Sequence, residues 1–160
     1  MRIKSGLGYD IHRLVEGRPL YLGGIQIPFP RGLHGHSDGD CLVHAIMDAL
    51  LGAMGEKDIG QHFSDQDPRH KNRRSLEMLQ EVMRLMHDQD HEILNIDSLV
   101  IAEEPKLGPY MSEIKETLCT VLSLTPDKLG IKARTNEGLG AIGRGEAIAA
   151  WAVVLIRKKG

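Results

Sequence analysis

Three side chains that commonly bind metal ions occur at spacings that can bring them together. Asp10 and His12 are separated by one residue, so on a strand their side chains project from the same face. His44 follows Asp40 by one helical turn and precedes Asp48 by another. One carboxylate and two imidazoles suit Zn²⁺ and leave a fourth position open, as in catalytic sites. On spacing alone, a strand-end aspartate beside a surface histidine is the more common arrangement.

Two further segments combine polar side chains with glycines. Residues 36–40, HSDGD, precede the helical segment of His44, where they could bind an anion or merely cap the helix. Residues 134–140, RTNEGLG, place the Thr135 hydroxyl two residues from the Glu137 carboxylate, ahead of glycines that allow close backbone approach. Glu137 would suit a hard ion such as Mg²⁺, and a turn with a solvated glutamate fits the same spacing.

The pattern of apolar residues predicts the elements that must position these groups. It favours an α/β (α+β) fold, a two-layer sandwich of a mixed β-sheet with helices packed on one face. Residues 28–36 read as turns and residues 58–74 as a loop. Strands are expected at 2–15, in two short pieces over 21–27, and at 93–102, 131–135 and 147–156, with helices over about 42–52, 76–86 and 109–122.

The last predicted strand, AIAAWAVVLI at 147–156, is apolar at every position. A sheet with one face in water alternates apolar and polar residues, so this pattern predicts burial of both faces. The predicted helices cover one face, and a second copy of the chain is the simplest cover for the other. A central strand within a monomer would read the same way.

The composition limits the classes of protein to which this chain can belong. A chain of 160 residues can form one domain, residues 1–160, with a core of its own. Lys and Arg total 20 against 22 Asp and Glu, a net charge of -2 that gives no global attraction to nucleic acid. The two cysteines form no ligand-spaced cluster, and no apolar run resembles a signal peptide or a membrane span. We therefore expect a cytoplasmic protein that binds neither nucleic acid nor membrane.

The motifs together resemble those of the 2-C-methyl-D-erythritol 2,4-cyclodiphosphate synthase family. They occur in order over nearly the whole chain: GYDIHRL at 8–14, HSDGD at 36–40, DALLGA at 48–53, DIG at 58–60, DQDP at 65–68, EPK at 104–106, TNEGLG at 135–140 and GRGE at 143–146. The resemblance implies a metal-dependent phosphorus–oxygen lyase of the non-mevalonate isoprenoid pathway. It would convert 4-diphosphocytidyl-2-C-methyl-D-erythritol 2-phosphate to the cyclic diphosphate and CMP.

The resemblance also assigns roles to particular residues. It implies one Zn²⁺ per active site on Asp10, His12 and His44, and a second divalent cation, Mg²⁺ or Mn²⁺, on Glu137. His36 and Thr135 match a catalytic pair that stabilises the transition state. Substrate contacts are implied for a larger set: Asp10, Ile11, His12, His36, Ser37, Asp58, Ile59, Gly60, Phe63, Ser64, Asp65, Gln66, Asp67, Ala102, Glu103, Glu104, Pro105, Lys106, Leu107, Gly108, Arg134, Thr135, Asn136, Glu137, Ala141 and Arg144.

The family assembles as a homotrimer with active sites at subunit boundaries, and Arg144 and Glu146 match residues of a central channel proposed to hold an isoprenoid diphosphate. Arg134, Gly138 and Ala141 stand where other members often carry Thr, Lys and an aromatic residue.

Two other classes of protein fit the metal motif. A metal-dependent phosphohydrolase would release inorganic phosphate, and a non-catalytic binder of isoprenoid diphosphates would show no turnover.

Overall fold

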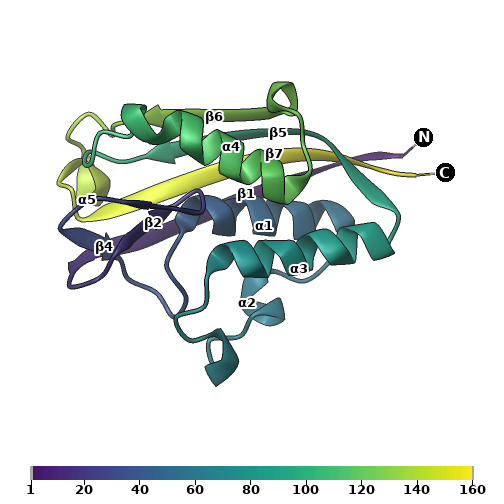
Figure 1. Cartoon of the computed structure of the whole chain (residues 1–160), viewed down its shortest axis with the longest axis horizontal. Helices are drawn as coiled ribbons and strands as arrows, with labels where there is room; N and C mark the ends of the chain where they lie inside the picture. Colours follow the sequence, from purple (N-terminus) through teal and green to yellow (C-terminus); the bar gives the residue numbers. More distant parts are fainter. Residues whose placement is uncertain (1, 160) are drawn as a thin grey trace.

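The computed structural model describes residues 2–159, which form a five-stranded mixed sheet with the strand order β4-β1-β7-β5-β6 (Figure 1). The long strand β1 (Ile3–Glu16) pairs antiparallel with β7 (Ala147–Lys158), and β7 pairs antiparallel with β5 (His91–Ile101). Strand β6 (Leu129–Arg134) is parallel to β5. A separate hairpin joins β2 (Leu20–Leu22) and β3 (Ile25–Ile27).

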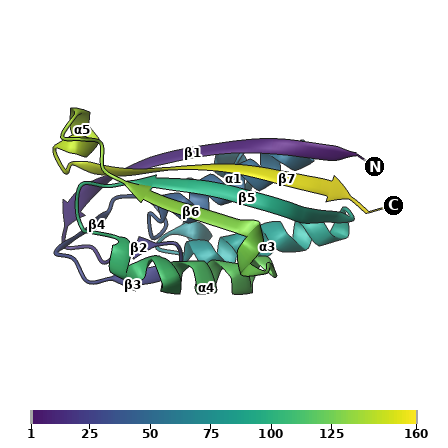
Figure 2. The ribbon, with the colours of Figure 1, turned by 90° about the horizontal axis from the view of Figure 1, so that it is seen from above.

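Three long helices lie on one face of this sheet (Figure 2). They are α1 (Cys41–Met54), α3 (Ser75–Asp88) and α4 (Met111–Leu122). Helix α1 packs unusually close to β1, because a Cβ built on Gly6 or Gly8 would lie 1.9 or 1.8 Å from a carbonyl oxygen of the helix. Glycine is therefore required at both positions. This close contact brings the helix side chains directly beside those of β1.

The opposite face of the sheet carries exposed apolar side chains. On β1, Leu7 is 67% exposed and Tyr9 is 47% exposed, and on β7, Val153 is 46% exposed. Leu7 pairs with Val153, and Tyr9 pairs with Trp151 and stacks on it at a ring-centroid distance of 4.6 Å. The predicted burial of both faces of the last strand therefore does not occur within one chain. Its helix-facing residues are buried. On its other face Val153 and Leu155 are exposed, whereas Ala147 and Ala149 are buried in a small cluster with Ile142.

The mixed sheet with helices packed on it is confirmed, and the strands and long helices lie close to their predicted ranges. Two predicted loops were wrong in part. Residues 28–36 contain β4 (Arg31–Leu33), which pairs with the end of β1. Residues 58–74 contain α2 (Ile59–His62) and the 3₁₀ helix Pro68–His70. Each begins after an aspartate whose side chain accepts a backbone N–H, and such caps stabilise even one turn.

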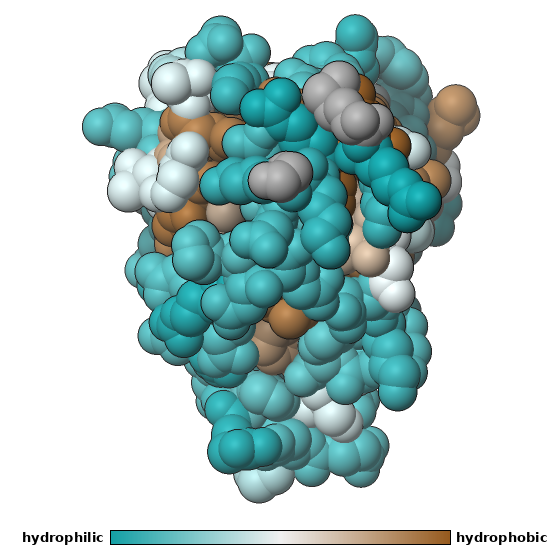
Figure 3. Space-filling model, turned by 90° about the vertical axis from the view of Figure 1, so that its right-hand side faces the viewer, coloured by the Kyte–Doolittle hydropathy of each residue, from teal (hydrophilic) through white to brown (hydrophobic). Residues whose placement is uncertain are grey.

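Within residues 2–159 no helix is both long and apolar enough to cross a membrane. The two chain ends emerge from the same end of the molecule (Figure 1). Seen from that end, the surface is mostly hydrophilic, with apolar atoms in small separate patches (Figure 3). The short helix α5 (Gly140–Gly143) lies at the opposite end, before β7 begins (Figure 1), and two further 3₁₀ helices span Gly108–Tyr110 and Pro126–Lys128.

Candidate active site

The predicted metal ligands meet where β1 lies against α1. Asp10 Oδ2 is 2.7 Å from His12 Nε2 and 2.9 Å from His44 Nδ1, and the two imidazole nitrogens are 3.3 Å apart. Two ligands of a tetrahedral zinc, each about 2.0–2.1 Å from the ion, would be separated by about 3.3 Å. We call these three residues the metal cluster. Their donor set and convergence fit a divalent metal ion.

Local structure explains how the cluster forms. Asp10 and His12 alternate with Ile11, whose side chain lies on the open face of the sheet and is 42% exposed. His44 occupies the first turn of α1, which begins after Asp40. The Asp40 carboxylate accepts N–H groups of Gly23, Gly24 and Val43, so it ties the β2–β3 turn to the start of α1. Asp40 is therefore the cap of this helix, rather than Ser37 or Asp38.

Charge in the cluster is shared between one carboxylate and two imidazoles. Burial acts to raise the pKa of Asp10, but hydrogen bonds and attraction from His12 and His44 outweigh it and hold the pKa well below its usual range. Burial acts to lower the pKa of His12, while Asp10 and the carbonyl of His34 raise it more. Burial beside Asp38 raises the pKa of Asp40 to about 6. Asp10 thus stays ionised at neutral pH, as a cation ligand must.

A cavity of about 310 Å³ opens beside the metal cluster. Segments far apart in sequence meet there, namely β1, residues 36–37, α1 and the α2 region. The predicted site residues that line it are Asp10, His12, His36, Ser37, His44, Ile59, Gly60, Phe63 and Asp65. Around it, Asp58 caps α2, and the Asp67 carbonyl accepts a hydrogen bond from His36 Nε2 at 3.3 Å. Ser64 and Gln66 lie in the same connection and are joined by a hydrogen bond.

A second cavity, of about 370 Å³, lies where β5 and β6 end. The predicted site residues that line it are Ala102, Pro105, Lys106, Leu107, Gly108, Arg134 and Thr135. The peptide bond between Glu104, which is exposed, and Pro105 is cis. The structure thus brings the predicted substrate contacts of residues 102–108 together with Thr135, one member of the predicted catalytic pair. The other member, His36, lines the first cavity.

The turn at residues 135–138 connects β6 to α5. Glu137 has a φ of 52° and is exposed, and its carboxylate accepts a hydrogen bond from the Thr135 hydroxyl at 3.4 Å. The Glu103 carboxylate holds this turn, because its Oε1 accepts the N–H groups of Asn136 at 2.7 Å and Gly138 at 3.3 Å. Glu137 is not part of the metal cluster. Its carboxylate is free to face a ligand from solvent.

Two predicted contacts lie beyond this turn. Ala141 is exposed on α5. Arg144 follows α5 and forms an ion pair with Glu146, with its Nε 2.7 Å from the carboxylate. Both positions are on the surface of the single chain.

Several residues of the site carried no signal in the sequence. His70 and Met78 also line the first cavity. Arg18 donates hydrogen bonds to the carbonyls of Gly35 and Ser37 and so fixes the segment that carries His36. Arginines that bind a loop carbonyl have no characteristic spacing, so only the structure reveals this one.

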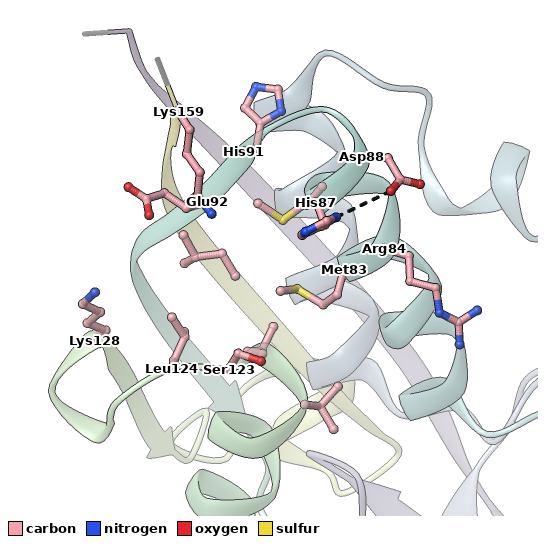
Figure 4. A pocket seen from close by; sticks show the side chains of 14 residues that line it. Met83, Arg84, His87, Asp88, His91, Glu92, Ser123, Leu124, Lys128 and Lys159 are labelled. Atoms are coloured by element: carbon pink, nitrogen blue, oxygen red, sulfur yellow. Dashed lines mark ion pairs between the residues drawn. The ribbon is translucent and has the colours of Figure 1, made fainter.

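A third cavity, of about 480 Å³, lies between the ends of α3 and α4 and the start of β5. Met83 and Leu124 point into it, and charged side chains such as Arg84 and Lys128 lie at its edges (Figure 4). His87 and Asp88 form an ion pair there at 3.6 Å. It contains none of the predicted site residues and lies away from the metal cluster.

Fold and site together define a two-layer α/β protein with a three-ligand site for a divalent metal, and comparison with known proteins agrees. The family model of the YgbB family matches residues 3–157. The 2-C-methyl-D-erythritol 2,4-cyclodiphosphate synthase of Pelotomaculum thermopropionicum is 51% identical over 158 residues, which are 99% of this chain and 98% of that one. The chain therefore belongs to the YgbB family.

Solved structures show the same fold. The bifunctional IspDF from Campylobacter jejuni matches with a TM-score of 0.94 and 39% identity over 99% of this chain, which spans 43% of that longer chain. A 2C-methyl-D-erythritol-2,4-cyclodiphosphate synthase in its CDP-bound form matches with a TM-score of 0.88 and 44% identity, covering 98% of this chain and 100% of that one.

Proposed function

We propose that this chain cyclises 4-diphosphocytidyl-2-C-methyl-D-erythritol 2-phosphate to 2-C-methyl-D-erythritol 2,4-cyclodiphosphate and CMP, as part of non-mevalonate isoprenoid biosynthesis. The observation that carries the proposal is the metal cluster, which faces a cavity lined by the polar segments expected to bind substrate. The 51% identity, over nearly the full length, to a relative that bears this enzyme name supports the proposal. The proposed enzyme is a single cytoplasmic domain, residues 1–160, and its two buried free cysteines suit that compartment.

The reaction needs alignment and charge neutralisation rather than a protein nucleophile. The terminal phosphate oxygen of the substrate attacks the β-phosphorus of the same molecule, and the bond to CMP breaks. Asp10, His12 and His44 would hold a Zn²⁺, which supplies Lewis-acid stabilisation to the phosphate oxygens when bound. His36 and Ser37, in the same cavity, orient the phosphate and donate hydrogen bonds to developing charge.

The second half of the proposed site binds the nucleotide. Residues 102–108 and 134–135 line the second cavity, where backbone groups would read the cytosine. Thr135 would stabilise the transition state together with His36. Glu137 would hold Mg²⁺ or Mn²⁺ against the diphosphate, because such ions use one or two carboxylates plus substrate phosphates.

In this proposal the two cavities form one active site across a subunit boundary of a homotrimer. The separation of His36 from Thr135 between two cavities of one chain supports this assembly. So does the exposed apolar face of β1 and β7, where large side chains such as Leu7 and Val153 need a cover. Arg144 would then face a central channel that could take an isoprenoid diphosphate.

The products of the reaction test this function. Phosphorus NMR of the substrate after incubation with zinc-loaded protein and Mg²⁺ is expected to show a cyclic diphosphate and CMP in equal amounts. Release of inorganic phosphate would indicate a metal-dependent phosphohydrolase instead. Unchanged substrate in the presence of bound zinc would indicate a non-catalytic binder and would contradict the proposal.

A further inference from the structure

Behind the metal cluster, the far side of the His44 ring meets a buried serine and aspartate. His44 Nε2 is 2.8 Å from the Ser75 hydroxyl, and that hydroxyl donates a short hydrogen bond to Asp38 Oδ1. Ser75 is the first residue of α3 and is 0% exposed, while Asp38 and His44 are each 6% exposed. Three polar side chains from separate parts of the chain thus form a continuous buried line that ends at a metal ligand.

The chemistry of this line fixes the direction of its hydrogen bonds. Asp38 accepts N–H groups on both oxygens, from Asp40 on Oδ1 and from Ser75 and Arg74 on Oδ2. It therefore acts as an acceptor, and the single hydroxyl proton of Ser75 goes to it. Ser75 Oγ then has only lone pairs to offer His44, so His44 Nε2 must donate. When a metal is bound, the imidazole is neutral and its other nitrogen, Nδ1, which lies 2.9 Å from Asp10 Oδ2, is the one left to hold the ion.

The second imidazole of the cluster is held in a matching way. His12 Nδ1 donates to the His34 carbonyl oxygen at 2.6 Å, which leaves Nε2, beside Asp10, as the nitrogen that can bind a metal. With a metal bound, both rings therefore direct a nitrogen lone pair to the same point. Ser37 Oγ is also near His44 Nε2, at 3.2 Å, but it lies at the longer distance and lines the substrate cavity. Ser75, which lies outside that cavity lining, is the closer partner.

We propose that Ser75 and Asp38 are positioning residues for the metal site: they hold His44 as its Nε2–H tautomer and fix its ring so that Nδ1 faces the metal. The inference rests on the proposed metal site and assigns two residues that act through His44 rather than on substrate. Partners that orient a metal-bound histidine in this way typically contribute about 10- to 100-fold to metal affinity. The line also joins α3 to the site, because Asp38 accepts the first backbone N–H of that helix.

The test compares Ser75→Ala with a matched control, Ser98→Ala. Ser98 is also buried, at 1% exposed, and its hydroxyl donates a single hydrogen bond to the Gly130 carbonyl at 2.8 Å, between β5 and β6. Zinc affinity is measured by competition with a chromophoric chelator. Ser75→Ala is expected to weaken zinc binding about 10- to 100-fold, and Ser98→Ala to leave it unchanged. Equal affinity in Ser75→Ala and the wild type would overturn the inference.

Two spectroscopic measurements separate positioning from general stability. The visible spectrum of the Co²⁺-loaded protein is expected to change in Ser75→Ala and not in Ser98→Ala, because only the first alters a ligand's orientation. In the zinc-loaded wild type, nitrogen-15 NMR should find the His44 proton on Nε2 and the metal on Nδ1. The reverse arrangement would overturn the inference even if Ser75→Ala failed to fold. A wild type that binds no zinc would instead contradict the proposed function, and this inference with it.

Discussion

The metal cluster and the 135–138 turn both present side chains suited to a cation, but they are held differently. In the cluster, His44 is almost fully buried, and each imidazole has a hydrogen-bond partner on the side away from Asp10. In the turn, Glu103 fixes the backbone, while the Glu137 side chain is exposed and contacts Thr135 at 3.4 Å. The cluster is thus preorganised within one chain. In the turn the backbone is fixed, but a ligand or a second subunit must orient the Glu137 carboxylate.

The largest loss of activity is expected when a residue of the metal cluster is removed. His44→Ala should lower kcat/KM by roughly 1000-fold, equivalent to about 4 kcal/mol, because zinc binding fails and its charge stabilisation is lost. Added Zn²⁺ should not restore the rate. The control is His87→Ala, whose ring is 84% exposed on α3 and should be silent. A His44→Ala enzyme with more than a tenth of wild-type activity would remove the zinc assignment.

Chelation should act like the loss of His44 but remain reversible. A strong chelator at neutral pH is expected to abolish cyclisation while circular dichroism and thermal unfolding change little, because the core does not depend on an open-sided three-ligand site. Added Zn²⁺ should restore turnover. Unfolding on chelation would show that the site is structural rather than catalytic.

A smaller effect is expected in the turn. Glu137→Gln should keep zinc and lower kcat about 100-fold, because the neutral amide still fits while the second cation loses its anionic ligand. Zinc content and the dependence of rate on Mg²⁺ concentration are the measurements, and Glu113→Gln, at an exposed position of α4, is the control. An undiminished rate in saturating Mg²⁺ would show that Glu137 does not bind that ion.

The smallest effect is expected from the residue that holds the turn. Glu103→Ala removes the acceptor of two backbone N–H groups and should lower kcat/KM about tenfold, by loosening the turn that carries Thr135 and Glu137. Glu103→Gln keeps an oxygen acceptor and should retain most of the rate. If both variants lose activity equally, the charge of Glu103 matters rather than its role as an acceptor.

The same contrast explains what the sequence could predict. Strand alternation placed Asp10 and His12 on one face, and helical periodicity placed His44 on the helix that packs beside them. The closeness of that packing depends on Gly6 and Gly8, whose role appears only when the helix is in place. The capped turn α2 had a signal, since Asp58 stands three residues before Gln61, but one turn in a polar stretch is easily read as a loop.

Other parts of the site could not be predicted from sequence. Ser75 lies 31 positions from His44, and a serine at the start of a helix ordinarily indicates capping. The resemblance places Glu103 among the substrate contacts, but no pattern in the sequence indicates that its carboxylate fixes a turn 33 positions away. Each depends on a tertiary contact between segments that have no common periodicity. Long-range polar contacts of this kind become visible only in the folded chain.

Mixing two impaired variants tests whether the metal cluster of one chain and the 135–138 turn of another together form one active site. His44→Ala and Glu137→Gln proteins, refolded together from denaturant, would assemble at random into trimers. At roughly one quarter of the boundaries an intact cluster would then meet an intact turn. The predicted result is recovery of about one quarter of wild-type turnover, whereas each variant refolded alone retains about 1% or less. If the mixture shows no more activity than the separate variants, each site lies within a single chain and the shared-site account is contradicted.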